Sequence, residues 1–307
     1  MTPQAPLVSV GLPVWNGANF LGEALDSILG QTFRDFELII SDNASTDSTP
    51  EIAQRVADLD PRVRYLRQER NVGAAENFNV VLAEARGKYF CWVAHDDLWS
   101  PEYLERCVEV LDSDPEVVLC FSGFADVDPT GAEIDRSSPR PELGADQAHL
   151  RFRNVMHHPM VRPIFGLART DALRRTRQFL PHLGSDRALL AELTLQGPFR
   201  EIPDTLFFSR QHPDRYANVA KNSRERSRWW LPEGERRTVL LPNWTRLVDY
   251  GHAIRRVPLP RDERRQCWRE LAAHARRRWR PLVYDLGSAG RDLVARGADQ
   301  ARARVRR

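Results

Sequence analysis

Short apolar runs alternate with segments of helical periodicity through the first 121 residues, and this alternation constrains the fold more than any other feature. The apolar runs are Leu7–Leu12, Phe36–Ile40, Val63–Leu66, Tyr89–Val93 and Val117–Phe121. Apolar residues recur at helical spacing in the segments between them. Strands that alternate with helices of this length form a parallel sheet with helices on both faces. We therefore predict an α/β fold with a mostly parallel, Rossmann-like sheet.

Polar residues follow four of these predicted strands, at the point where each strand ends. The four groups are Pro13-Val14-Trp15-Asn16, Asp42-Asn43, Arg70-Asn71 and His95-Asp96-Asp97. Ligands of open α/β sheets bind outside the carboxyl ends of the strands. We therefore expect these groups to converge on one edge of the sheet and to form a binding site there.

Asp96 and Asp97 are adjacent acids directly after a buried strand, where each raises the cost of ionising the other. A hard divalent cation removes this conflict, because it prefers oxygen ligands and can also bridge phosphate oxygens. The segment after the first strand reads GLPVWNG, so neither a GxGxxG fingerprint nor a GxxxxGK[ST] loop is present there. This argues against a Rossmann dehydrogenase and a P-loop nucleoside triphosphatase.

Charge divides the chain into two parts. Residues 221–307 carry 23 Lys and Arg against 10 Asp and Glu, whereas residues 1–220 carry 22 Lys and Arg against 32 Asp and Glu.

The four cysteines form no CxxC pair, which favours buried thiols in a reducing compartment over a zinc site or a disulfide framework. The N-terminus has no signal-peptide pattern, and no stretch reaches 18 uninterrupted apolar residues, so we expect a cytoplasmic protein.

Several motifs, taken in order and spacing, resemble the family 2 glycosyltransferases, which have the GT-A fold. They are the opening run VSVGLPVWNGANFLGEALDSILGQTFRDFELIISDNASTDST, then RNVG at 70–73, ARGKYFCWVAHDD at 85–97, GSDRALLAEL at 184–193 and SRQHPDR at 209–215. The resemblance covers residues 7 to about 215. It implies an inverting, metal-dependent enzyme that moves a sugar from a nucleotide diphosphate, favouring UDP or dTDP, to an acceptor hydroxyl.

The resemblance also implies roles for the residues at the strand ends. Pro13, Trp15 and Asn16 fall where the family encloses the base, and Asp42 where it accepts a hydrogen bond from the uracil or thymine ring. Arg70 and Asn71 match positions that contact the base or its ribose, and Asp96 matches one that contacts the ribose or the sugar. Asp97 is the expected ligand of Mn²⁺ or Mg²⁺, although Ala94 replaces the first acid of the family's metal-binding signature.

Three later residues complete the expected site. Asp186 matches the family's general base, which takes the proton of the acceptor hydroxyl as its oxygen attacks the anomeric carbon. The metal, together with Arg210 or His212, is expected to offset charge on the leaving diphosphate. His212 is alternatively a metal ligand, or a structural residue before Pro213.

We expect a catalytic domain over residues 1–220, with a nucleotide-sugar part to about residue 125 and an acceptor part over 126–220. Residues 221–307 form a basic helical extension. Its tryptophans and arginines favour either packing on the catalytic domain, a homo-oligomer contact, or peripheral attachment to an anionic membrane. We expect a glycan or lipid-linked acceptor and no nucleic acid partner.

Two other functions remain open at this point. A nucleotidyltransferase on a similar sheet needs a phosphate-binding loop after the first strand, which GLPVWNG does not supply. A non-catalytic nucleotide-sugar-binding homologue is favoured only by Ala94. Cell-envelope or exopolysaccharide synthesis is the expected pathway class.

Overall fold

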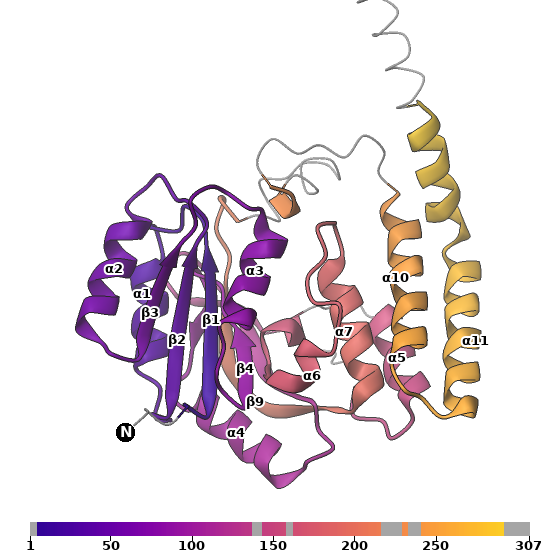
Figure 1. Ribbon diagram of the computed structural model, residues 1–307, viewed down its shortest axis with the longest axis horizontal. Coiled ribbons are helices and arrows are strands. Elements are labelled where there is room, and N and C mark those ends of the chain that lie inside the picture. The colour runs from indigo at the N-terminus through magenta and orange to yellow at the C-terminus, as the bar shows by residue number, and fades with distance from the viewer. Residues whose placement is uncertain (1–4, 137–142, 158–161, 216–228, 233–240, 292–307) are drawn as a thin grey trace, which may run out of the picture.

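The computed structural model describes residues 5–136, 143–157, 162–215, 229–232 and 241–291. Within these ranges the strands belong to one sheet (Figure 1). They are β1 (Val8–Val14), β2 (Phe36–Asp42), β3 (Val63–Arg67), β4 (Tyr89–Trp92), β5 (Leu98–Trp99), β6 (Leu119–Val127), β7 (Glu133–Arg136), β8 (Leu167–Arg169) and β9 (Phe199–Arg210).

The described helices lie between and after these strands. They are α1 (Leu21–Leu29), α2 (Thr49–Leu59), α3 (Ala74–Ala83), α4 (Tyr103–Ser113), α5 (Ala148–His157), the 3₁₀ turn Arg162–Phe165, α6 (Thr170–Arg174), α7 (Ser185–Gln196), α10 (Pro242–Arg256) and α11 (Arg261–Arg277). Residues 279–291 continue as a further helix after α11.

The sheet order is β3-β2-β1-β4-β8-β6-β9-β5, with β7 paired to β6. β1 pairs in parallel with β2 and β4, and β2 pairs in parallel with β3. β8 runs antiparallel to β4 and β6, and β5 runs antiparallel to β9. The predicted α/β class with a mostly parallel sheet and flanking helices is confirmed.

Alternating side chains on the central strands face opposite layers of the protein. Val10 of β1 and Leu38 of β2 belong to the core that includes α1 and α4. Ile39 of β2 and Trp92 of β4 face the core that includes α3 and α7. The sheet is therefore buried on both faces, as a parallel sheet requires.

Gly11 shows how closely α3 approaches β1. A Cβ at this position would lie 2.7 Å from a side-chain carbon of Val81 on α3 and 2.7 Å from the ring of Phe90 on β4. Only glycine fits there without a shift of its neighbours.

Several boundaries differ from the sequence-based expectation. The apolar pattern of the sequence predicts strands at Leu206–Ser209 and Ile164–Ala168, and the composition of residues 128–148 predicts a loop or ribbon. In the structure β9 begins earlier, at Phe199, and the segment Arg162–Phe165 is a 3₁₀ turn followed by the short β8. β7 lies within 128–148 and forms an antiparallel ribbon with β6, while residues 137–142 lie outside the described residues.

The basic C-terminal helices pack on the acceptor-side helices. Buried Tyr250 and Ile254 of α10 and Leu271 of α11 share a core with residues of α5 and α7. Asp249 of α10 is buried and pairs with Arg177 at 3.0 Å and with His182 at 3.1 Å. These contacts join the helices to the catalytic part, while the proposed boundary at residue 220 stays a prediction.

The four cysteines are buried, as expected of thiols that pack as small apolar groups. Within the described residues, no helix combines the length and the apolar composition needed to cross a bilayer.

Candidate active site

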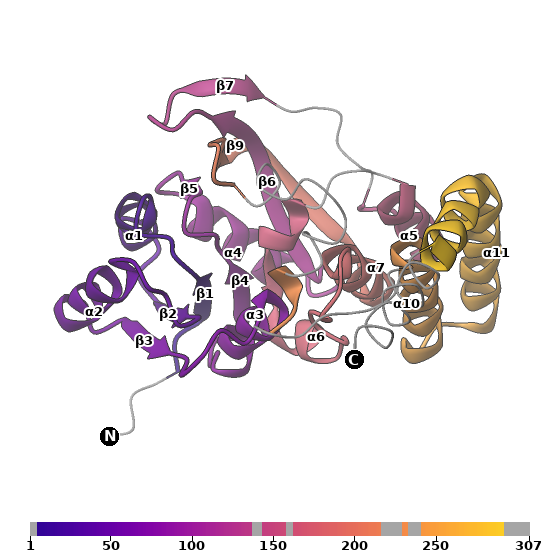
Figure 2. The same cartoon turned by 90° about the horizontal axis from the view of Figure 1, so that it is seen from above.

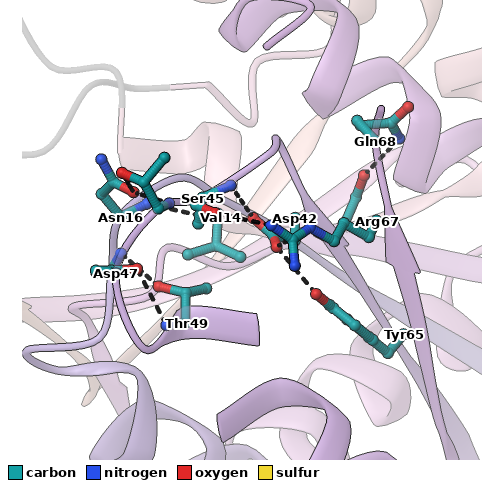
Figure 3. Close-up of polar contacts among 12 residues, drawn as sticks. Val14, Asn16, Asp42, Ser45, Asp47, Thr49, Tyr65, Arg67 and Gln68 are labelled. Carbon is teal, nitrogen blue, oxygen red and sulfur yellow. Dashed lines mark hydrogen bonds and ion pairs between the residues drawn. The ribbon is translucent and has the colours of Figure 1, made fainter. Parts of the chain in front are cut away.

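The loops after β1 and β2 are joined by short polar contacts (Figure 3). The side-chain carbonyl of Asn16 accepts a hydrogen bond from the backbone N–H of Thr46 at 2.8 Å. The backbone N–H of Asn16 donates to Ser45 Oγ at 2.8 Å. The backbone of Asn16 is left-handed, at φ 50°, a conformation that asparagine tolerates better than most residues. Asn16 therefore fixes the relative position of the two loops.

Asp42, the last residue of β2, is completely buried. Its Oδ1 accepts a hydrogen bond from the Ser45 amide at 2.9 Å, and its Oδ2 accepts one from the Tyr65 hydroxyl at 2.9 Å (Figure 3). The Arg67 Nε lies 3.7 Å from the same Oδ2. Burial and the bond to Asp42 raise the pKa of Tyr65 well above its usual value, so this hydroxyl stays a donor.

Tyr65 and Arg67 were not identified from the sequence. Both lie on β3, two residues apart, so their side chains share one face of that strand. In the parallel register Arg67 lies opposite Asp42. Two polar residues at alternating positions of the strand VRYLR are the signal that, in principle, marks them.

The other predicted base-site residues lie near this pair of loops. Pro13 is buried in β1, whereas the Trp15 side chain is 47% exposed. Arg70 is exposed. Asn71 accepts hydrogen bonds on Oδ1 from Asn43 Nδ2 and from the Gly73 amide, both at 2.9 Å. As it lies, Asn71 supports the turn into α3.

A second group forms where β4 and β9 end. The Nε2 of His212 lies 3.0 Å from Oδ2 of Asp96. The Arg210 amide donates to Oδ1 of Asp97 at 3.1 Å, and the Arg210 Nε donates to the Asp96 carbonyl at 3.1 Å. All four residues are buried. The structure thus brings together two pairs of residues, Asp96–Asp97 and Arg210–His212, that lie more than a hundred positions apart in the sequence.

Burial raises the pKa of Asp97 to about 7, and the neighbouring charge of Asp96 adds to the shift. Burial lowers the pKa of the adjacent His95. His95 packs on Gly17, where an added Cβ would lie 2.5 Å from the imidazole ring. Gly17 therefore brings the first loop against the Asp96–Asp97 loop, so the two groups are neighbours.

The Arg210 guanidinium is fully buried, and each of its nitrogens has a partner. Besides the Asp96 carbonyl, it donates to the Pro129 carbonyl at 2.6 Å and to Glu23 Oε2 at 2.6 Å. It also lies over the Phe20 ring, 4.7 Å from the centroid. Arg210 holds the two acids and α1 in place, and diphosphate contact would require some of these bonds to break.

Asp186 lies in the first turn of α7, apart from both groups. Gly184, at φ +87°, forms the left-handed turn that opens the helix. The pKa of Asp186 is raised by burial and is lowered to a lesser extent by Arg187 and by Arg246 of α10. Among the described residues, Asp186 has no hydrogen bond or ion pair with the Asp96–His212 group.

The sheet order, the acids after β4 and the long strand β9 beside β6 define the class of fold. It is a GT-A fold, with its candidate site at the carboxyl ends of the strands. The sequence model of glycosyl transferase family 2 matches residues 9–171, which is more than half of the chain. The chain belongs to this family.

Curated relatives cover the N-terminal half. An uncharacterized glycosyltransferase of Rickettsia prowazekii is 37% identical over 154 residues, which are 50% of this chain and 47% of the relative. The hyaluronan synthase of Pasteurella multocida is 30% identical over 155 residues, 50% of this chain and 16% of that protein. The chain spans less than half the length of these relatives.

Two solved structures share the fold. S. aureus TarS 1–349 in complex with UDP-GlcNAc has a TM-score of 0.66 at 18% identity, covering 87% of this chain and 72% of that chain. The mannosyltransferase PcManGT of Pyrobaculum calidifontis, in complex with GDP-Man and Mn²⁺, has a TM-score of 0.55 at 20% identity, covering 97% and 81%.

Proposed function

We propose that this chain is an inverting glycosyltransferase that moves a sugar from a nucleotide diphosphate to an acceptor hydroxyl. The observation that carries the proposal is the buried pairing of Asp96 with His212 beside Asp97. This pairing lies at the strand ends, where α/β sheets bind their ligands. Family membership favours this function over nucleotidyl transfer.

The donor set around Asp97 fits a divalent cation held jointly with substrate. Within the described part of the chain, no three His, Cys, Asp or Glu side chains are grouped to hold a metal ion. Mg²⁺ usually uses one or two carboxylates and completes its shell with substrate phosphates and water. Asp97 would supply a carboxylate, and His212 an imidazole once its bond to Asp96 is released. When bound, Mn²⁺ or Mg²⁺ would neutralise charge on the diphosphate.

The Asp42 group supports a uracil or thymine base. An ionised carboxylate only accepts hydrogen bonds, and these bases offer a ring N–H. Tyr65 and Arg67 already contact Oδ2 of Asp42, so a base must displace the Arg67 side chain, which is 51% exposed. The exposed Trp15 ring is free to stack on the base. A UDP- or dTDP-sugar is therefore the favoured donor.

Asp186 is the proposed general base. Burial raises its pKa, which makes the ionised carboxylate a stronger proton acceptor. As the acceptor oxygen attacks the anomeric carbon, its proton passes to Asp186, and the bond between that carbon and the diphosphate oxygen breaks. The nucleoside diphosphate leaves with the electron pair. The single displacement inverts the anomeric carbon.

The acceptor is proposed to be a glycan or a lipid-linked glycan. The hyaluronan synthase relative makes a polysaccharide, as its name states. Cell-envelope or exopolysaccharide synthesis is therefore the favoured pathway class.

Donor binding and turnover test this proposal separately. Thermal shift with UDP-, dTDP- and GDP-sugars in Mn²⁺ identifies the donor, because ligands of the native state raise its melting point. Donor hydrolysis is then measured for the wild type, Asp97→Asn and Asp186→Asn. Asp58→Asn is the matched control, since Asp58 is exposed on α2 and bonds only to Gln54 within the described residues.

We expect a shift with UDP- or dTDP-sugars, and hydrolysis reduced on the order of a hundredfold or more in both site variants. Wild-type rates of donor hydrolysis by Asp186→Asn would contradict the assignment of Asp186 as the general base. A thermal shift without turnover of any donor would instead favour the non-catalytic homologue that Ala94 left open.

A further inference from the structure

Exposed large apolar side chains gather on the C-terminal helices. Of the nine such residues in the described part of the chain, six lie on α10 or on the helix 279–291. The six are Trp244, Val248, Trp279, Val283, Tyr284 and Leu286. Their side chains, together with Arg276, Arg280 and Arg291, are called the C-terminal face below.

The helix 279–291 has one buried side and one exposed side. Leu282, Asp285 and Ala289 are buried, at spacings of three and four residues. Trp279 and Val283 lie four residues apart beside this buried side, with exposures of 56% each. The helix is therefore packed along one side while these apolar residues stay exposed.

Contacts between the two helices make the face continuous. The Trp244 Nε1 of α10 donates to the Leu282 carbonyl at 3.0 Å. The Asn243 amide and side chain both donate to Asp285, at 2.8 and 3.0 Å. The start of α10 is thus fixed against the helix 279–291, and Trp244 joins the exposed residues of both elements.

Arginines alternate with the apolar groups on this face. Arg280 lies over the Trp279 ring at 5.6 Å, and Arg291 over the Tyr284 ring at 5.9 Å. No carboxylate of the described residues pairs with Arg276, Arg280 or Arg291. The acid of this helix, Asp285, is buried and bonded to Asn243. The face is therefore both apolar and strongly positive.

We propose that the C-terminal face docks the protein on an anionic lipid surface. Trp and Tyr rings are favoured at the level of lipid headgroups, and arginines there meet phosphate groups. A second copy docked face to face would bring the arginines of both copies together, which opposes that occupant. Within the described residues, no helix is long and apolar enough to cross a bilayer, and the proposed attachment is peripheral.

Flotation of the full chain with vesicles tests this surface. One set of vesicles is phosphatidylcholine alone, and the other contains phosphatidylglycerol as well. One variant removes apolar contact (Trp279→Ser with Val283→Ser), and one removes charge (Arg280→Gln with Arg291→Gln). The control is Leu59→Ser with Arg55→Gln on α2, where both residues are exposed. Figures 1 and 2 show α2 at the opposite end of the molecule from α11.

We expect the wild type and the control to float only with the anionic vesicles, and less at high salt. The charge variant should lose affinity by more than about tenfold, since each arginine near an anionic surface contributes about fivefold. Equal flotation of all proteins would overturn the proposal. A second result would also overturn it. If sedimentation showed that the wild type is a dimer and that the Trp279→Ser with Val283→Ser variant is a monomer, the C-terminal face would be assigned to contact with a second copy. Flotation does not depend on catalysis, so its outcome is independent of the proposed enzyme activity.

Discussion

The Nε2 of His212 lies 3.0 Å from Oδ2 of Asp96, although 116 positions separate the two residues. The contact forms because β9 ends beside the loop that follows β4. Asp97 in the same loop receives the Arg210 amide. The segment SRQH and the pair of acids are thus two halves of one buried group.

This pairing predicts the effect of His212→Gln. Glutamine keeps a polar group near Asp96 but removes the imidazole, so metal-supported turnover should fall about 10- to 100-fold, as is typical of losses at metal sites. The measurement is donor hydrolysis across a Mn²⁺ titration. A higher Mn²⁺ requirement would show that the imidazole acts at the metal.

His252→Gln is the control for that experiment, because His252 is exposed on α10. Its Mn²⁺ titration should match that of the wild type. If His212→Gln also matched the wild type, His212 would be structural, which the sequence left open.

Tyr65→Phe tests the group around Asp42. The change removes the hydroxyl that donates to the buried Oδ2. A hydrogen bond to a charged group contributes about 1.5–3 kcal/mol, and we expect the free energy of unfolding to fall by about this amount. Urea unfolding measures it, and UDP affinity measured in parallel shows whether the base site depends on the same bond.

Tyr284→Phe is the matched control, since the Tyr284 ring is 68% exposed. Its unfolding free energy should stay within about 0.5 kcal/mol of the wild type. An equal effect of the two substitutions would mean that the bond to Asp42 contributes no net stability.

The class of fold could be predicted from the sequence because two signals agree over residues 7–121. The spacing of apolar residues indicates alternating strands and helices, and polar residues follow the predicted strands. The acids at 96 and 97 were found for the same reason. Tyr65 was missed because it lies inside a strand, and Arg67 because it follows directly after the predicted strand Val63–Leu66 and belongs to none of the strand-end groups considered. Their role depends on the register of β3 with β2, which the sequence pattern does not specify.

The strands after β6 were harder to predict for a different physical reason. β9 contains Pro203 and several exposed polar residues, so its apolar alternation is interrupted before Leu206. β7 is fully exposed and carries almost no apolar signal. The partners of Arg210, including Glu23 in α1, are fixed by tertiary packing alone.

Asp249→Ala tests how the C-terminal helices are joined to the catalytic part. The carboxylate is buried and pairs with Arg177 and His182. Its removal leaves two basic groups without their partner, which typically costs about 3–5 kcal/mol for a buried pair. Because Arg177 is partly exposed, we expect the lower end of this range in urea unfolding.

The exposed pair of Arg106 and Asp204 gives the comparison. Asp204→Ala should change stability by less than about 1 kcal/mol, because exposed ion pairs contribute little. A single unfolding transition in both proteins would show that α10 unfolds with the sheet. A separate transition at lower urea concentration in Asp249→Ala would show that α10 unfolds before the sheet.

His274 of α11 predicts a loss of stability in acid. Its side chain is buried, and burial together with His157, Arg278, Arg246 and Arg277 lowers its pKa to about 4. The unfolded chain binds a proton near pH 6.5. Between these values the unfolded state holds more protons, so stability is complete above about pH 6.5 and falls as the pH drops to 4.

The expected loss from His274 is on the order of 3 kcal/mol, since each pKa unit corresponds to about 1.4 kcal/mol. His274→Gln cannot be protonated, so its unfolding free energy should change less between pH 7 and pH 4. His252→Gln, which alters an exposed imidazole on α10, should keep the wild-type pH profile. Urea unfolding at a series of pH values makes the comparison. Parallel profiles for His274→Gln and the wild type would show that acid destabilisation arises at other groups, because the buried imidazole would then contribute no linkage.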